Sequence, residues 1–191
     1  MFERFAVEAK LVLNTARAES QRLRHEWLGA EHLLLALLAV SDGLAPEVLR
    51  EPACDPGEMR KQVDRSAGSI PLTFVGHGQI PFTRSAKEAL HIALTEADAL
   101  GHPKVGTGHL LIGLMAGPES IAADVLRTRN ITLEMVRAKV IEHGGWDAPA
   151  EPVASDTGSR MHVLRQAVAV LRAIGETDTA VQVERALHRL T

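Results

Sequence analysis

Histidine and glutamate side chains that could bind a metal ion or transfer protons gather at two places in the chain. His25, Glu31 and His32 lie close together, and His102 and His109 form a second pair with the same spacing as His25 and His32. A zinc site of the enzyme type uses patterns such as His-Glu-x-x-His or paired Cys and His residues, and the sequence has neither. We therefore predict no metal site, and histidines that hydrogen-bond backbone carbonyls at helix boundaries.

Other catalytic patterns are also missing from the sequence. It contains no Gly-x-Ser-x-Gly or Ser-x-x-Lys motif, and its one cysteine, Cys54, has no patterned base to activate it. The pair Gly101 and Gly106 has the spacing of a phosphate-binding loop, but Thr107 stands where the loop needs lysine. We predict a protein with no catalytic residue, no cofactor and no enzymatic activity.

Composition narrows the fold class and the partners. Hydrophobic residues make up 46% of the 191 residues, while aromatic residues make up 3% and tyrosine is absent, which favours packed helices with an aliphatic core. A net charge of −3 disfavours nucleic acid as a partner. Charged residues at the N-terminus disfavour a signal peptide, and the longest apolar run, residues 33–40, is too short to cross a membrane. We expect a cytoplasmic protein.

The sequence contains an internal repeat. A shift of 77 positions aligns residues 5–50 with 82–127 without a gap and gives 18 identities in 46 positions. Unrelated sequences of this composition would give about three. The identical pairs include Phe5 with Phe82, Lys10 with Lys87, and His32 with His109. The chain is therefore a tandem duplication of one unit.

Apolar residues recur at helical spacing within each copy. They predict a long first helix, a very apolar core helix (31–40 and 108–116), a third helix (45–50 and 122–127) and a fourth (56–66 and 132–143), with Thr132 as an N-cap. Copy one is assigned to residues 1–66 and copy two to 80–143, joined by a Gly- and Pro-containing connector at 67–79. We predict an all-α fold in which two four-helix units pack about a pseudo-twofold axis.

A second Gly- and Pro-rich stretch separates the C-terminal part of the chain. Residues 144–158 are interpreted as a linker, and the apolar stripes in residues 159–191 predict a helical hairpin. The double repeat would then form one domain over residues 1–143.

Four short motifs mark the two copies: the opening Met-Phe-Glu-Arg-Phe, Ile-Pro-Phe-Thr at residues 80–83, and the turns Gly-Ala-Glu-His-Leu-Leu at 29–34 and Gly-Thr-Gly-His-Leu-Leu at 106–111. Together these motifs resemble the Clp N-terminal repeat of ClpC-type Hsp100 unfoldases. The resemblance covers residues 1–143 and implies a docking module that receives adaptors and marked substrates. No ATPase motif accompanies it in this sequence, so the resemblance points to a stand-alone docking domain.

The resemblance also implies a phosphoarginine pocket at the start of each core helix. In the family, a threonine and the helix N-terminus suit the phosphate and a glutamate pairs with the guanidinium. Copy one has Ala30 in place of the threonine but keeps Glu31 before His32, whereas copy two keeps Thr107 but has Gly108 in place of the glutamate. Neither pocket is complete, and copy one is the better candidate because it keeps the carboxylate. The favoured alternative is that Glu31 and Thr107 are ordinary residues of the first turn of a helix.

A second site implied by the resemblance is a groove between the two long first helices, which binds cyclic-peptide antibiotics in related domains. Phe2, Lys10, Phe82 and Lys87 hold the matching positions. The alternative, favoured for Phe82, is that Phe5 and Phe82 are equivalent core residues and that the lysines are solvated. The leading hypothesis is a module that binds protein clients, adaptors or Clp ATPase and protease components, as an adaptor or a decoy. The alternative is a sponge or sensor for a cyclic peptide in this groove.

Overall fold

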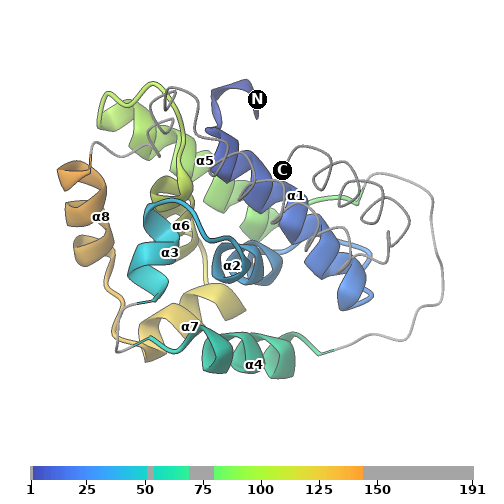
Figure 1. The fold of residues 1–191 in the computed structure, drawn as a ribbon. Helices are drawn as coiled ribbons and strands as arrows, with labels where there is room; N and C mark the ends of the chain where they lie inside the picture. The colour runs from blue at the N-terminus through green and yellow to red at the C-terminus, as the bar shows by residue number, and fades with distance from the viewer. Residues whose placement is uncertain (1, 51–53, 69–79, 144–191) are drawn as a thin grey trace, which may run out of the picture. The chain divides into compact units, whose positions relative to one another are not determined.

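The computed structural model describes residues 2–50, 54–68 and 80–143, and these ranges form a helical domain (Figure 1). The predicted all-α class is confirmed for them. A short 3₁₀ turn comes first and α-helices follow, with the bounds η1 Phe2–Arg4, α1 Val7–Arg22, α2 Ala30–Ala39, α3 Leu44–Leu49, α4 Pro56–Ala67, α5 Arg84–Ala99, α6 Thr107–Ala116, α7 Ile121–Thr128 and α8 Leu133–Glu142.

The helices repeat with the shift of 77 residues that the sequence predicted. Helices α1 to α4 correspond to α5 to α8, and each boundary agrees with its counterpart to within about two residues. The N-caps of the fourth helices also correspond. Asp55 accepts hydrogen bonds from Gly57 N–H and Glu58 N–H, and Thr132, the predicted N-cap, accepts one from Met135 N–H. The predicted linker at 144–158 and hairpin at 159–191 lie outside the described residues, as does most of the connector.

Two short backbone contacts show how the copies pack. Phe5 pairs with Val105, and Leu28 pairs with Phe82. Phe5 and Phe82 are equivalent in the repeat, and so are Leu28 and Val105. Replacing each residue of one contact by its counterpart in the other copy therefore gives the second contact. Such an exchange is expected when a twofold axis relates the two copies. The backbone hydrogen bonds obey the same exchange, because Ala6 N–H donates to Val105 O at 2.9 Å and Thr83 N–H donates to Leu28 O at 2.9 Å.

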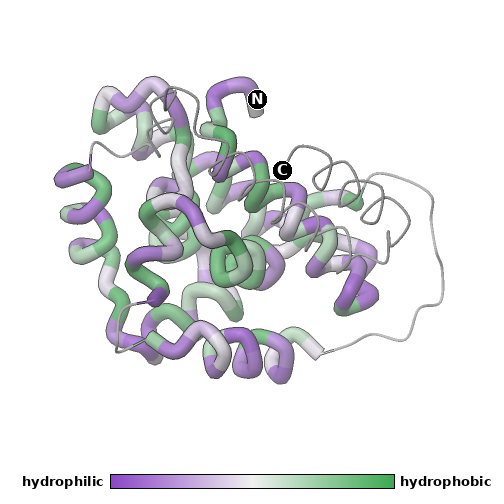
Figure 2. The backbone as a smooth tube through the Cα atoms, viewed as in Figure 1, coloured by the Kyte–Doolittle hydropathy of each residue, from purple (hydrophilic) through white to green (hydrophobic). Residues whose placement is uncertain are grey.

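The core helices α2 and α6 lie at the centre of the domain. Helix α2 buries Leu33, Leu34, Leu35 and Leu37 almost completely, and α6 likewise places Leu110, Leu111, Ile112 and Leu114 in the core. Figure 2 shows α2 as an almost unbroken hydrophobic segment surrounded by helices with mixed faces. In the described part of the chain no single helix is long and apolar enough to cross a bilayer, although α6 and α7 together, bent by 99°, meet that test on length and composition.

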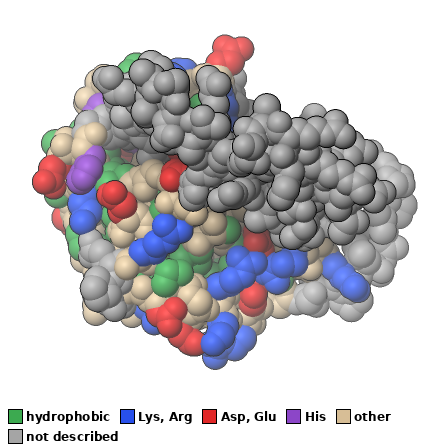
Figure 3. Space-filling model, in the orientation of Figure 1, with side chains coloured by type: hydrophobic (Ala, Val, Ile, Leu, Met, Phe, Trp, Pro, Cys, Tyr) green, Lys and Arg blue, Asp and Glu red, His purple; other side chains and the backbone are tan. Residues whose placement is uncertain are grey.

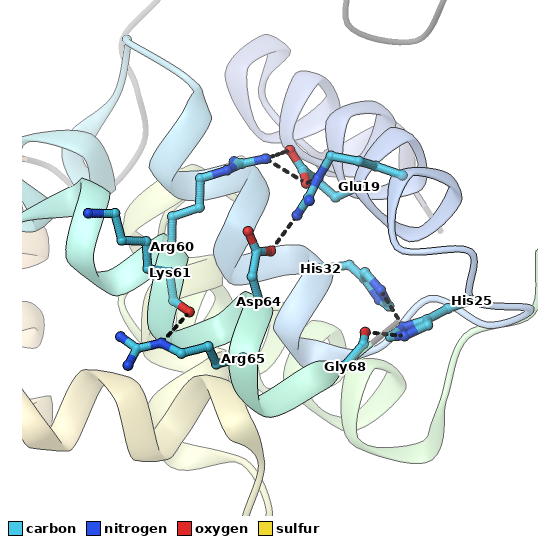
Figure 4. Close-up of polar contacts among 9 residues, drawn as sticks. Glu19, His25, His32, Arg60, Lys61, Asp64, Arg65 and Gly68 are labelled. Atoms are coloured by element: carbon cyan, nitrogen blue, oxygen red, sulfur yellow. Dashed lines mark hydrogen bonds and ion pairs between the residues drawn. The ribbon is translucent and has the colours of Figure 1, made fainter. Parts of the chain in front are cut away.

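Each copy ties its first helix to its fourth helix through an equivalent ion pair. Glu19 of α1 accepts hydrogen bonds from Arg60 of α4 at 2.6 and 2.8 Å (Figure 4). Glu96 of α5 is paired in the same way with Arg137 of α8. The four residues are related by the shift of 77, although the gap-free alignment of identities ended before Arg60. Charged side chains of both signs are also scattered over the described part of the face shown in Figure 3.

Candidate functional site

A groove of about 420 Å³ lies where α1 meets the segments that enter α2 and α5. One face of α1 supplies Lys10, Leu13, Asn14 and Arg17, whose spacing places them along a single helical stripe. Leu28, Ile80 and Phe82 complete the lining. The backbone pairing of Leu28 with Phe82 holds the two entering segments together, so the twofold contact between the copies also shapes this groove.

The groove contains only part of the set predicted from sequence. Lys10 and Phe82 both line it, and a binding role for them stays a prediction. Lys87 is exposed on α5 and is not among the lining residues, and the side chain of Phe2 lies outside the described part of the structure. Phe5, the repeat counterpart of Phe82, is 1% exposed in the core, whereas Phe82 is only partly buried. The groove therefore breaks the symmetry of the repeat.

The chemistry of the groove suits an amphipathic ligand with acidic groups. Leu13, Leu28 and Phe82 offer apolar surface, while Lys10 and Arg17 bring positive charge along α1. Apolar contact supplies most of the binding energy in such sites, and charges at the rim mainly select the partner and speed association.

The residues at the start of α2 define the copy-one pocket position. Ala30 is buried, and the Glu31 side chain is 12% exposed. The Glu31 carboxylate folds back over Gly29 so closely that a Cβ on Gly29 would lie 2.2 Å from Oε1. Its neighbour across the turn is the His32 ring, with Glu31 Oε1 3.4 Å from His32 Nδ1. Copy one thus keeps a mostly buried carboxylate at a helix N-terminus.

The equivalent position in copy two is filled by packing. Thr107 is fully buried, and its hydroxyl accepts a hydrogen bond from Ala45 N–H at 3.1 Å. Gly108 is covered as well, because a Cβ there would lie 2.7 Å from Val140 and 2.9 Å from Leu44. Thr107 therefore ties α6 to the start of α3, and the missing side chain at Gly108 lets α8 and α3 close over this end of α6.

Four of the histidines form two equivalent pairs, in which His25, His32 and His109 are buried and His102 is half-buried (Figure 4 shows the first pair). Gly29 N–H donates to His32 Nδ1 at 2.8 Å, so the neutral His32 ring carries its proton on Nε2. That nitrogen lies 2.9 Å from His25 Nδ1, and His25 Nε2 lies 3.1 Å from Gly68 O. A consistent direction follows: Gly29 donates to His32, His32 to His25, and His25 to the carbonyl at the end of α4.

Copy two repeats this arrangement. Gly106 N–H donates to His109 Nδ1 at 3.0 Å, and His109 Nε2 lies 3.0 Å from His102 Nδ1. Burial lowers the pKa of His109 to about 4, and burial together with His25 and Arg22 lowers that of His32 to about 3. The His32 and His109 rings are neutral at ordinary pH. The sequence predicted partners among backbone carbonyls; His25 has one, Gly68 O, whereas the other bonds join the two rings of a pair or come from a backbone N–H.

Ligand-type atoms of His25, Glu31 and His32 lie within 4.8 Å of one another. All four ring nitrogens of this pair nevertheless have hydrogen-bond partners in the structure. Glu31 also approaches the very nitrogen of His32 that accepts the Gly29 N–H. The arrangement accounts for the histidines as structural residues, and the absence of a metal site stays a prediction.

A comparison with protein families assigns the chain. The family model of the Clp repeat (R) N-terminal domain matches residues 4–129 and, in an overlapping match, residues 81–188. The chain belongs to the Clp repeat N-terminal domain family. The resemblance predicted from sequence is thereby confirmed.

The relatives in this family are longer proteins, and the chain matches only a part of each. The chain is 35% identical over 191 residues to the ATP-dependent Clp protease ATP-binding subunit ClpA homolog of Porphyra purpurea, covering 98% of this chain and 22% of the relative. It is 39% identical over 142 residues to a probable Clp ATP-binding subunit of Chlamydia pneumoniae, covering 74% of this chain and 17% of the relative. The chain thus spans about a fifth of these relatives' length.

Solved structures share the Clp repeat fold. The N-terminal domain of the chaperone ClpD from Arabidopsis thaliana is 21% identical with a TM-score of 0.57, covering 75% of this chain and 96% of that domain. The Hsp104 N-terminal domain from Candida albicans is 18% identical with a TM-score of 0.61, covering 76% and 95%. These structures support the architecture of the two repeated units.

Proposed function

We propose that this Clp repeat domain is a non-catalytic docking module of the Clp protease and chaperone system. It binds protein clients, adaptors or Clp components as an adaptor or decoy. The observation that carries the proposal is the groove on α1, which joins apolar surface to two cationic side chains at the contact between the copies. Family membership supports this protein-binding role over the small-molecule alternative. A cytoplasmic location stays a prediction.

Charge reversal at the groove tests the proposal. Lys10→Glu should weaken binding of an unfolded acidic client about tenfold, because it places a negative charge on the rim of the groove. The probe is reduced, carboxymethylated α-lactalbumin, and the measurement is fluorescence anisotropy at constant ionic strength. Lys10 is exposed, so the substitution should leave folding intact.

The repeat provides the matched control for this experiment. Lys87 is the counterpart of Lys10 in copy two and is exposed outside the groove lining. Lys87→Glu makes the same change in net charge and should leave affinity within about twofold of the original. Equal losses in the two variants would show that net charge, rather than the groove, attracts the client. No binding by the unmodified protein would contradict the proposal itself.

We assign residual phosphoarginine recognition, if the domain has it, to copy one. Glu31 keeps a carboxylate that can pair with a guanidinium, whereas the Thr107 hydroxyl is already bonded to Ala45 and Gly108 is covered. Free phosphoarginine should shift NMR signals around Ala30 and His32, and Glu31→Gln should abolish the shifts. Glu26→Gln, an exposed neighbour, is the control. Shifts around Thr107, or shifts that survive Glu31→Gln, would contradict this assignment.

A further inference from the structure

We propose that a second cleft, between the end of α6, α7 and the start of α8, binds an extended peptide segment that carries an apolar side chain beside a carboxylate. The inference rests on the proposed docking function but concerns a site separate from the groove on α1. The two lining sets share no residue.

The cleft has an apolar floor and a polar rim. Met115, Ala123, Ile131 and Leu133 supply the apolar surface, and Arg127, Asn130 and Thr132 supply the polar groups. Its outline depends on a sharp turn: Asn130 has a φ of 57°, which sends the chain from α7 directly into α8. Asparagine tolerates this left-handed conformation better than most residues do.

Size limits what the cleft can hold. Its volume is about 280 Å³, at or just below the lower end of the range for small-molecule sites. A cleft of this size holds one or two side chains of an extended segment. Because its floor is apolar, an apolar side chain fits there at the least desolvation cost.

Arg127 determines the charge of the preferred segment. Its guanidinium lies 2.8 Å from Asp124, one turn earlier on α7, and the two side chains are 53% and 67% exposed. An exposed pair of this kind contributes little to stability. Arg127 can therefore exchange Asp124 for a carboxylate delivered by a bound segment, which the cleft shields partly from water and which strengthens the pair.

The equivalent arginine in copy one, Arg50, makes different hydrogen bonds. Arg50 is the repeat counterpart of Arg127, and the run Val-Leu-Arg is identical in the two copies. The Arg50 guanidinium donates to Val40 O at 2.9 Å and Ser41 O at 3.1 Å, at the end of α2. Glycine and proline occupy the counterparts of Val40 and Ser41 in copy two, at 117 and 118. Arg50 is thus held by backbone carbonyls, whereas Arg127 pairs only with an exposed carboxylate among the described residues.

The test uses the isotope-labelled chain of 191 residues and two peptides. The probes are N-acetyl-Gly-Ser-Leu-Asp-Gly-amide and the same peptide with asparagine in place of aspartate. We expect the aspartate peptide to produce saturable NMR shifts at Met115, Ile131 and Leu133, with affinity about fivefold higher than that of the asparagine peptide. Arg127→Gln should remove this difference. Arg84→Gln, which neutralises a side chain that is 95% exposed on α5, should preserve it.

Several results would overturn the inference. Equal affinity for the two peptides would show that Arg127 does not pair with the peptide carboxylate. The same conclusion would follow if Arg127→Gln still preferred the aspartate peptide over the asparagine peptide. Shifts at Leu13 and Phe82 alone would move the peptide to the groove on α1, leaving the docking function intact. Shifts at the cleft that grow with protein concentration in the absence of peptide would make a second copy of the chain its occupant.

Discussion

Gly113→Ala should lower the free energy of unfolding by about 3 kcal/mol or prevent folding. The Cβ of an alanine at 113 would lie 2.1 Å from the carbonyl oxygen of Ala89 and 3.0 Å from its carbon. Both are backbone atoms of α5, so no side-chain rotation relieves the clash and the helices must separate. Alanine favours a helix over glycine by about 1 kcal/mol, which is too little to offset the lost packing between α5 and α6.

Urea unfolding followed by circular dichroism measures this effect. Gly57→Ala is the control, because Gly57 also lies in a helix but its Cβ would meet only the Asp55 carboxylate, at 3.1 Å. That variant should change stability by about 1 kcal/mol or less. The prediction is wrong if the two variants have similar midpoints. It would then follow that α5 and α6 can move apart without loss of core contacts.

The 77-residue repeat made much of the fold predictable. The helical spacing of apolar residues identified each helix. Thr132 could be recognised as an N-cap because a capping residue acts on the backbone directly beside it. The position of Gly113 shows the limit of this reasoning. Its counterpart in copy one is Ala36, which is fully buried, so the repeat alone suggests that alanine fits at both sites. Only the approach of α5 in three dimensions distinguishes them.

The candidate groove was predictable in part. Lys10 and Phe82 were identified through the family resemblance, and the spacing of Lys10, Asn14 and Arg17 on one helical face could have indicated the rest of the α1 wall. The difference between Lys10 and Lys87 could not be predicted, because the two lysines are identical in the alignment. The difference between the two lysines depends on the chain segments that contain Leu28 and Ile80, whose positions are set by contacts between the copies.

The sequence predicted that the histidines are structural residues, but it did not predict that they bond to one another. Spacing placed His25 near His32 and did not show that Gly29 N–H occupies one nitrogen of His32. That bond fixes the proton on the opposite nitrogen and so determines the direction of the whole network. A proton added at His32 Nδ1 would break the hydrogen bond that this nitrogen accepts from Gly29 N–H.

This hydrogen-bond direction predicts a steep loss of stability in mild acid. The pKa is about 3 for His32 and about 4 for His109 in the folded protein, against about 6.5 in an unfolded chain. Between these values the unfolded chain binds protons that the folded one does not, so the free energy of unfolding falls as the pH falls. The stabilisation is complete above pH 6.5. From pH 7 to pH 5 the two residues together should remove about 4 kcal/mol.

Glutamine substitution at both positions tests the cause of this loss. His32 and His109 each occupy the third position of a core helix, where glutamine accepts the same bond from the residue that caps the helix. The double variant should be less stable at pH 7, yet its urea midpoint should vary much less between pH 7 and pH 5. Each single variant should lose about half of the pH dependence.

The lower limit of pH 5 keeps the measurement above the range in which ordinary carboxylates titrate. An unchanged pH dependence in the double variant would assign the effect to other groups, and a dependence that halves with each substitution would assign it equally to the two copies.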